Sequence, residues 1–103
     1  MSGDKIRVYA MRTDRADGYV TNVSNSLENL QRFVGGYIET VTPFTNLVII
    51  CNEEGRLRGL PYNCTILGYD FYGDILIAGV KGDEFADIPF PDVKVLRQLL
   101  GVK

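Results

Sequence analysis

The chain has 103 residues, of which 46% are hydrophobic and 23% charged, and its formal net charge is −2. This length predicts a single domain over residues 1–103, and the composition excludes a disordered or fibrous chain. Because 11 basic residues face 13 acidic ones, there is no positive excess to neutralise a nucleic-acid backbone, and we expect no nucleic-acid partner.

The apolar stretches of the chain are short. None approaches the roughly 20 residues needed to cross a bilayer, and the N-terminal residues MSGDKIRV lack the hydrophobic region of a signal peptide. We therefore expect a cytoplasmic protein that does not use a membrane. Two cysteines, Cys51 and Cys64, cannot build a four-ligand zinc site without histidine. We favour free thiols over the alternative, a disulfide.

The N-terminal residues predict a hairpin. Residues 5–11 alternate apolar and polar side chains, the pattern of a strand with one buried face. Turn-forming residues fill 13–18, and 19–23 is short and β-prone, so a second strand follows.

The next segment predicts a short amphipathic helix over residues 27–34. Apolar side chains recur on one face, and either Asn25 or Ser26 can cap the N-terminus, with Glu28 completing a capping box if Asn25 is the cap. The glycine pair 35–36 should end the helix, because glycine adopts the left-handed conformation found at helix termini.

The most apolar stretch is LVIIC, residues 47–51. It offers water no polar face, so other elements must cover both of its sides, and we predict a central strand over 47–52. A strand over 37–41, closed by Pro43, precedes it through a hairpin connection at 42–46.

Glycine and proline punctuate the residues that follow. Gly55, Gly59 and Pro61 argue against a long regular strand. Residues 64–73 are apolar enough to be packed, but their pattern favours neither helix nor strand.

The last third predicts a strand, a turn and a helix. Residues 74–80 form the strand, 81–83 the turn, and 85–88 a short extended piece. Asp92 is the expected N-cap of a helix that ends at Gly101. The whole order predicts an α+β domain with a mainly antiparallel sheet of about five strands and two short helices.

Three segments carry a family resemblance: VGGYIETV, LVIICNEEGRLRGLPYN and GDILIAGVKGDEFADIPFPDV. They resemble the uncharacterised family called domain of unknown function 3846, small proteins found largely in phages, plasmids and other bacterial mobile elements. The resemblance covers roughly Leu27 to the C-terminal helix, and leaves out Arg12, Arg15 and the segment CTILGYDFYG. It implies a mobile-element setting but no activity, cofactor or substrate. The matched positions are Gly35, Gly36, Tyr37, Asn52, Glu53, Gly55, Gly59, Pro61 and Asn63.

The chain lacks the usual catalytic groupings. Histidine is absent, and no serine or threonine stands beside a recognisable base. Glu53 and Glu54 could hold a cation together with Asp70 or Asp74, but a charged turn explains them better. We expect Cys51 to be a core residue, and we expect neither an enzyme nor a cofactor.

Two arginines follow the central strand. If the segment is extended, Arg56 and Arg58 project to the same side and suit a two-pronged grip on a carboxylate or phosphate, completed by Asn52 and Asn63. The alternative, which we favour, is that they pair with neighbouring acidic residues on a solvated turn.

A group of aromatic residues lies beside this turn, and it suits either a binding interface or the core. Our first hypothesis is a binding protein that contacts another protein or self-associates. The second is a binder of a small anionic ligand or nucleotide through Arg56 and Arg58, and the least favoured is an acidic mimic of nucleic acid. The expected binding residues are Asn52, Glu53, Arg56, Arg58, Tyr62, Asn63, Tyr69 and Tyr72.

Overall fold

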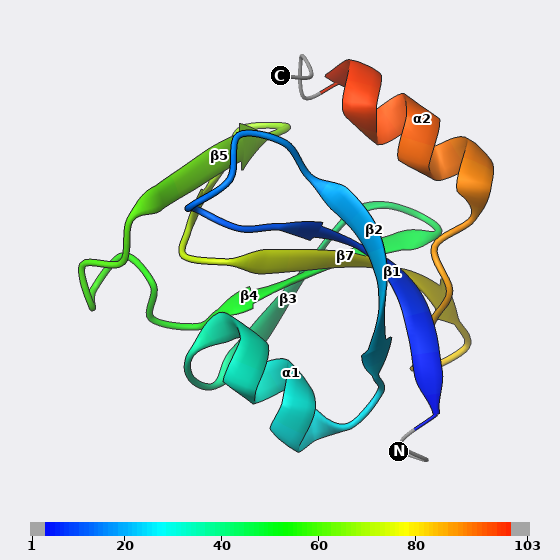
Figure 1. Ribbon diagram of the computed structural model, residues 1–103, viewed down its shortest axis with the longest axis horizontal. Coiled ribbons are helices and arrows are strands. Elements are labelled where there is room, and N and C mark those ends of the chain that lie inside the picture. Colours follow the sequence, from blue (N-terminus) through cyan, green and yellow to red (C-terminus); the bar gives the residue numbers. More distant parts are fainter. Residues whose placement is uncertain (1–3, 100–103) are drawn as a thin grey trace.

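A computed structural model describes residues 4–99 (Figure 1). In chain order, its elements are β1 (Lys5–Met11), β2 (Tyr19–Ser24), α1 (Leu27–Val34), β3 (Ile38–Phe44), β4 (Leu47–Asn52), β5 (Tyr62–Ile66), β6 (Tyr69–Tyr72), β7 (Ile75–Lys81), β8 (Glu84–Ala86) and α2 (Phe90–Leu99).

The main sheet is antiparallel, with strand order β2-β1-β7-β4-β3. Gly79 of β7 pairs with both Leu47 and Ala86, so β8 lies on the edge of β7 opposite to β4. The strands β5 and β6 form a separate hairpin. The predicted α+β class is therefore confirmed, although the described residues form more strands than the five expected.

Strand β4 is buried along its whole length, as its sequence predicts. Its residues alternate between two apolar clusters. Val48 and Ile50 belong to the cluster that includes Leu30 of α1, while Ile49 belongs to the cluster that includes Phe71 of β6. The middle position of the sheet, however, belongs to β7. The prediction that β4 is the central strand is wrong in this respect, because β7 is an equally continuous apolar run and pairs with β1, β4 and β8.

The sheet is covered on both faces (Figure 1). Helix α1 packs on one face, and its N-cap is Ser26, whose side chain accepts a hydrogen bond from the Asn29 backbone N–H. Gly35 ends α1 in the left-handed conformation, with φ of 81°, as predicted. The hairpin β5–β6 and helix α2 cover the other face. No helix within residues 4–99 has the length and apolar character needed to span a membrane.

Two predicted boundaries are wrong. Strand β3 continues through Pro43, because β3 lies at the sheet edge and its pairing register shifts between Val41 and Phe44, where a missing N–H is tolerated. Helix α2 begins at Phe90, so Asp92 lies in the first turn and is not the N-cap. The expected end of this helix at Gly101 falls outside the described residues.

The segment 64–73, for which the sequence favoured no structure, forms most of the hairpin β5–β6. Leu67 and Gly68 make its two-residue turn, and both have positive φ, at 49° and 87°. This is the conformation of a type I′ turn, which usually takes asparagine or glycine at both positions. Because leucine is unusual at the first position, sequence patterns do not identify this turn.

Candidate functional site

The turn that follows β4, residues 53–60, is coiled rather than extended. The Arg58 N–H donates to the Glu54 carbonyl at 2.8 Å, and the Leu60 N–H donates to the Gly55 carbonyl at 3.0 Å. The extended geometry assumed for Arg56 and Arg58 is therefore wrong, since these hydrogen bonds bend the chain between them.

Arg56 and Arg58 consequently lie in different surroundings. Arg58 forms an ion pair with Glu54 at 3.3 Å and lines a small hollow with Glu53 beside the end of α1. The guanidinium of Arg56 lies 5.4 Å from the ring centroid of Tyr72 and lines a separate hollow. The two guanidinium groups line different hollows and do not form one anion grip.

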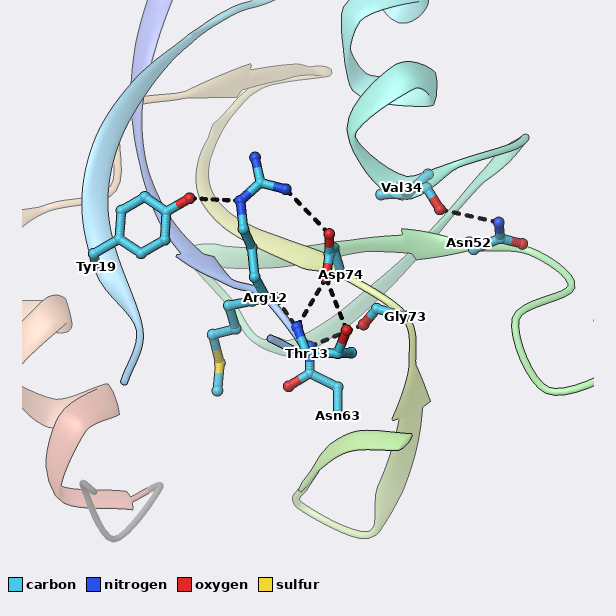
Figure 2. A network of polar contacts seen from close by, with 9 residues as sticks. Arg12, Thr13, Tyr19, Val34, Asn52, Asn63, Gly73 and Asp74 are labelled. Carbon is cyan, nitrogen blue, oxygen red and sulfur yellow. Dashed lines mark hydrogen bonds and ion pairs between the residues drawn. The ribbon is translucent and has the colours of Figure 1, made fainter. Parts of the chain in front are cut away.

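Asn52 has a positioning role. It is only 7% exposed, its side-chain N–H donates to the Val34 carbonyl at 3.0 Å, and its side-chain oxygen accepts from the Glu54 N–H at 2.7 Å. Figure 2 shows the bond to Val34. Asn52 thus joins the end of α1 to β4 and to the turn 53–60.

Asn63 has a similar role on the other side of the sheet. Its side-chain N–H group donates to the carbonyls of Met11 at 2.9 Å and Gly73 at 2.8 Å (Figure 2). One side chain thereby joins β5 to the end of β1 and to Gly73, the residue that follows β6. Both predicted asparagines therefore organise the backbone around the site.

The three predicted tyrosines lie on the hairpin β5–β6, two of them line a hollow with Arg56, and Leu57 follows Arg56 in the turn. We call the residues Arg56, Leu57, Tyr62, Tyr69 and Tyr72 the turn–hairpin surface. The rings of Tyr62 and Tyr72 meet edge to face at 5.6 Å, and Tyr69 lines the same hollow as Arg56 and Tyr72. Leu57 is 87% exposed, and Tyr62 and Tyr69 are each more than half exposed. Tyr62 and Tyr69 therefore belong to the exterior, Tyr72 is partly buried, and Phe71 belongs to the core.

The acidic residues considered for a cation do not converge. Asp70 accepts a hydrogen bond from the Thr65 hydroxyl at 2.6 Å, and Asp74 pairs with Arg12 at 3.1 Å. Among residues 4–99, no three acidic or cysteine side chains lie close enough to hold a metal ion. The charged-turn interpretation of Glu53 and Glu54 agrees with the ion pair of Glu54.

Cys51 and Cys64 are not joined by a disulfide, as predicted. Cys51 is buried in the core, where its thiol lies 3.5 Å from the Glu39 carbonyl oxygen that accepts from it. Burial, and secondarily the charge of Glu39, raises the pKa of Cys51 to about 11. A thiol with so little thiolate near neutral pH is a poor nucleophile.

A polar network surrounds the start of β7 (Figure 2). Asp74 accepts from the Thr13 N–H at 2.8 Å and from the Arg12 guanidinium, whose Nε donates to the Tyr19 hydroxyl at 2.8 Å. The hydrogen bond to Tyr19 is the main cause of a raised pKa of Arg12, and Asp74 adds to it. Two nitrogens of Arg12, Nε and Nη1, thus donate within the fold.

A hollow of about 620 Å³ lies next to this network. The β1–β2 loop, the start of β5 and helix α2 enclose it, and its lining includes Arg15, Tyr62, Asn63, Cys64 and Arg97. Sequence reasoning missed this site. The arginine-rich stretch RTDRADG was the signal within the loop, but its approach to α2 is a long-range contact that no local pattern shows.

The fold defines a small α+β domain. The chain belongs to the family described as domain of unknown function (DUF3846), whose sequence pattern matches residues 6–100. The match extends the resemblance noted above to the N-terminal hairpin, so the loop with Arg12 and Arg15 lies inside the family domain. Comparisons with curated proteins and with solved structures gave no significant match in either set.

Proposed function

We propose that this protein is a non-enzymatic binding protein that acts by contacting another protein through the turn–hairpin surface. The observation that carries this proposal is the exposure of Leu57, at 87%, on a turn held firmly to the sheet. Covering a leucine side chain is worth about 1.5–3 kcal/mol. A partner that covers Leu57 would therefore bind more favourably, because it would remove this side chain from water.

The neighbours of Leu57 have the composition of a protein interface. Tyrosine and arginine supply much of the binding energy in such contacts. Here the guanidinium of Arg56 lies 5.4 Å from the ring centroid of Tyr72, and the half-exposed Tyr69 lines the same hollow. A second copy of this chain is the other occupant that the surface suits, and self-association would use the same residues.

The setting that we propose is the cytoplasm of bacteria that carry phages, plasmids or other mobile elements. It is supported by the family resemblance, and inspection of the neighbouring genes tests it. The non-enzymatic character is supported by the absence of histidine from the sequence and by the burial of Cys51. The balance of 11 basic and 13 acidic residues gives no support to a nucleic-acid mimic.

A quantitative capture experiment tests the proposed surface. The tagged wild type and the double variant Leu57→Ala/Tyr69→Ala are incubated with a host lysate, and the captured proteins are compared by mass spectrometry. Leu27→Ala/Val95→Ala is the matched control, because these residues are also exposed apolar side chains but lie on the two helices.

We expect the Leu57/Tyr69 variant to lose one or more proteins that the wild type and the control both retain, or to lose self-association seen by light scattering. A monomeric wild type whose captured proteins are the same as those of the Leu57/Tyr69 variant would contradict the proposal.

A further inference from the structure

Strand β2 forms one edge of the main sheet, and within residues 4–99 it pairs only with β1. Arg7 of β1 lies opposite Asn22 of β2. The Arg7 N–H donates to the Asp87 carboxylate at 2.7 Å, and the Arg7 C=O accepts from the Ile88 N–H at 2.8 Å. Residues 87–88 follow β8, which lies on the same edge of β7 as β1. Since the Arg7 backbone points toward that edge, the Asn22 backbone points out of the sheet.

A contact at the end of β2 gives the same alternation. The Asn25 N–H donates to the Asp4 C=O at 2.8 Å, and this pair continues the β1–β2 register. Backbone groups alternate between the two sides of a strand, so positions 19, 21, 23 and 25 face β1. Positions 20, 22 and 24 therefore face outward.

Two of these three outward positions have open backbone groups. The Ser24 C=O already accepts from the Ser26 N–H and from the Asn29 side chain. Val20 and Asn22 are exposed, and their outward N–H and C=O groups meet no partner in the described part of the chain. Another strand laid along β2 would supply the missing partners.

The side chains of β2 do not guard this edge. Proteins protect edge strands from further pairing with charged residues, proline or a bulge. Strand β3, at the other end of the sheet, has all three, namely Glu39, Pro43 and a register shift between Val41 and Phe44. Strand β2 has the sequence YVTNVS, with neither charge nor proline, and its pairing with β1 shows no shift. Of the two edges, β2 is thus the one that can accept another strand.

The open groups of β2 are arranged symmetrically about Thr21, so the strand is complementary to its own copy. Two antiparallel copies related by a two-fold axis through Thr21 place Val20 of each opposite Asn22 of the other. These two pairs would exchange four hydrogen bonds between the open groups. Thr21 would lie beside Thr21 of the second copy, a favourable cross-strand pair, and no charged side chains of the two strands would oppose each other.

We propose that two copies of this chain pair through β2 about a two-fold axis at Thr21, which joins their main sheets into one continuous sheet. Because β3 is guarded, the assembly closes as a dimer and does not extend further. One short strand meets another, so the interface belongs to the small and weak class. It leaves out the turn–hairpin surface, and Leu57→Ala/Tyr69→Ala should therefore dimerise like the wild type.

Cysteine crosslinking tests the register. Thr21 and its copy form a non-hydrogen-bonded pair, in which Cα atoms lie about 4.5 Å apart, a separation that suits a disulfide. Thr21→Cys, in a Cys64→Ser background that leaves only the buried Cys51 of the native cysteines, should give a disulfide-linked dimer under mild oxidation. Asn22→Cys is the matched control. Its copy lies two residues, about 7 Å, further along the strand, beyond the reach of a disulfide.

Sedimentation equilibrium at protein concentrations up to about 1 mM measures the dimer itself. Asn22→Pro removes an outward N–H that no other group of the described chain uses, so circular dichroism should show an intact fold. By symmetry this variant loses two of the four hydrogen bonds, and the dimer should dissociate roughly tenfold or more as readily. Asn22→Ala keeps the N–H and should dimerise like the wild type.

The proposal is overturned if the wild type stays monomeric throughout this concentration range, or if Thr21→Cys gives no more linked dimer than Asn22→Cys. It is also overturned by a dimer that Asn22→Pro keeps and Leu57→Ala/Tyr69→Ala loses, which would assign self-association to the turn–hairpin surface.

Discussion

Substitution of Asn52 by alanine should destabilise the protein more than any other single change in the turn region. Asn52 is 7% exposed, and both of its side-chain hydrogen bonds go to backbone groups, the Val34 carbonyl and the Glu54 N–H. Alanine leaves both groups without this partner at the point where helix α1, strand β4 and the turn 53–60 meet.

The magnitude follows from the two lost bonds. Each hydrogen bond contributes about 1 kcal/mol net, and a buried group left without a partner costs about 1–3 kcal/mol. We therefore expect Asn52→Ala to lower the free energy of unfolding by about 2–4 kcal/mol, which corresponds to roughly 10–20 °C in Tm for a domain of this size.

Urea unfolding followed by circular dichroism and tyrosine fluorescence measures this change, since the chain has no tryptophan. Asn22→Ala is the matched control, because Asn22 is exposed on β2 and should change stability by less than about 0.5 kcal/mol. A cost for Asn52→Ala below about 1 kcal/mol, or one equal to that of the control, would refute the role assigned to Asn52.

Three further predictions concern the core and the polar network. The pKa of Cys51 is raised to about 11 in the folded protein. Between about pH 8.5 and 11 the unfolded chain therefore loses the Cys51 proton while the folded protein keeps it, so stability falls as the pH rises. The wild type should lose on the order of 2 kcal/mol of stability across this range relative to Cys51→Val, and parallel curves in urea titrations would argue against the shift. Gly79→Ala should lower the free energy of unfolding by at least about 2 kcal/mol in the same assay, because its Cβ would clash with the Asp87 carbonyl oxygen. Unchanged stability would contradict this close approach of residues 79 and 87. Asp74→Ala should lower the free energy of unfolding by about 1–2 kcal/mol, because it removes the acceptor of the Thr13 N–H. The control Asp83→Ala changes an exposed residue and should leave stability almost unchanged; equal losses from both variants would show that the polar network does not stabilise the fold.

Local sequence patterns predicted those elements whose structure depends on local physics. The alternation in β1, the unbroken apolar run of β4 and the glycine after α1 gave boundaries that agree with the structure. Each depends on one physical requirement, either burial of one face, burial of both faces or the left-handed backbone at a helix end.

The remaining features depend on contacts between distant residues. Leu67 occupies a backbone conformation that is rare for leucine, so the β5–β6 turn was not recognised. The hypothesis of a shared side for Arg56 and Arg58 required an extended segment, and the backbone hydrogen bonds that coil the turn could not be foreseen. The hollow lined by Arg15 and Arg97 forms because the fold brings the β1–β2 loop close to helix α2. These two residues are 82 positions apart in the sequence, and local patterns do not predict contacts over such a separation.

The central claim, that the turn–hairpin surface contacts another protein, is tested most directly by photo-crosslinking. A photoreactive phenylalanine replaces Leu57 in one sample and Val95, an exposed residue of α2, in another, and both are irradiated in host cells. We predict a discrete adduct, with a partner protein or a second copy of this chain, from position 57 and not from position 95. The absence of an adduct at position 57, or the same adducts from both positions, would contradict the claim.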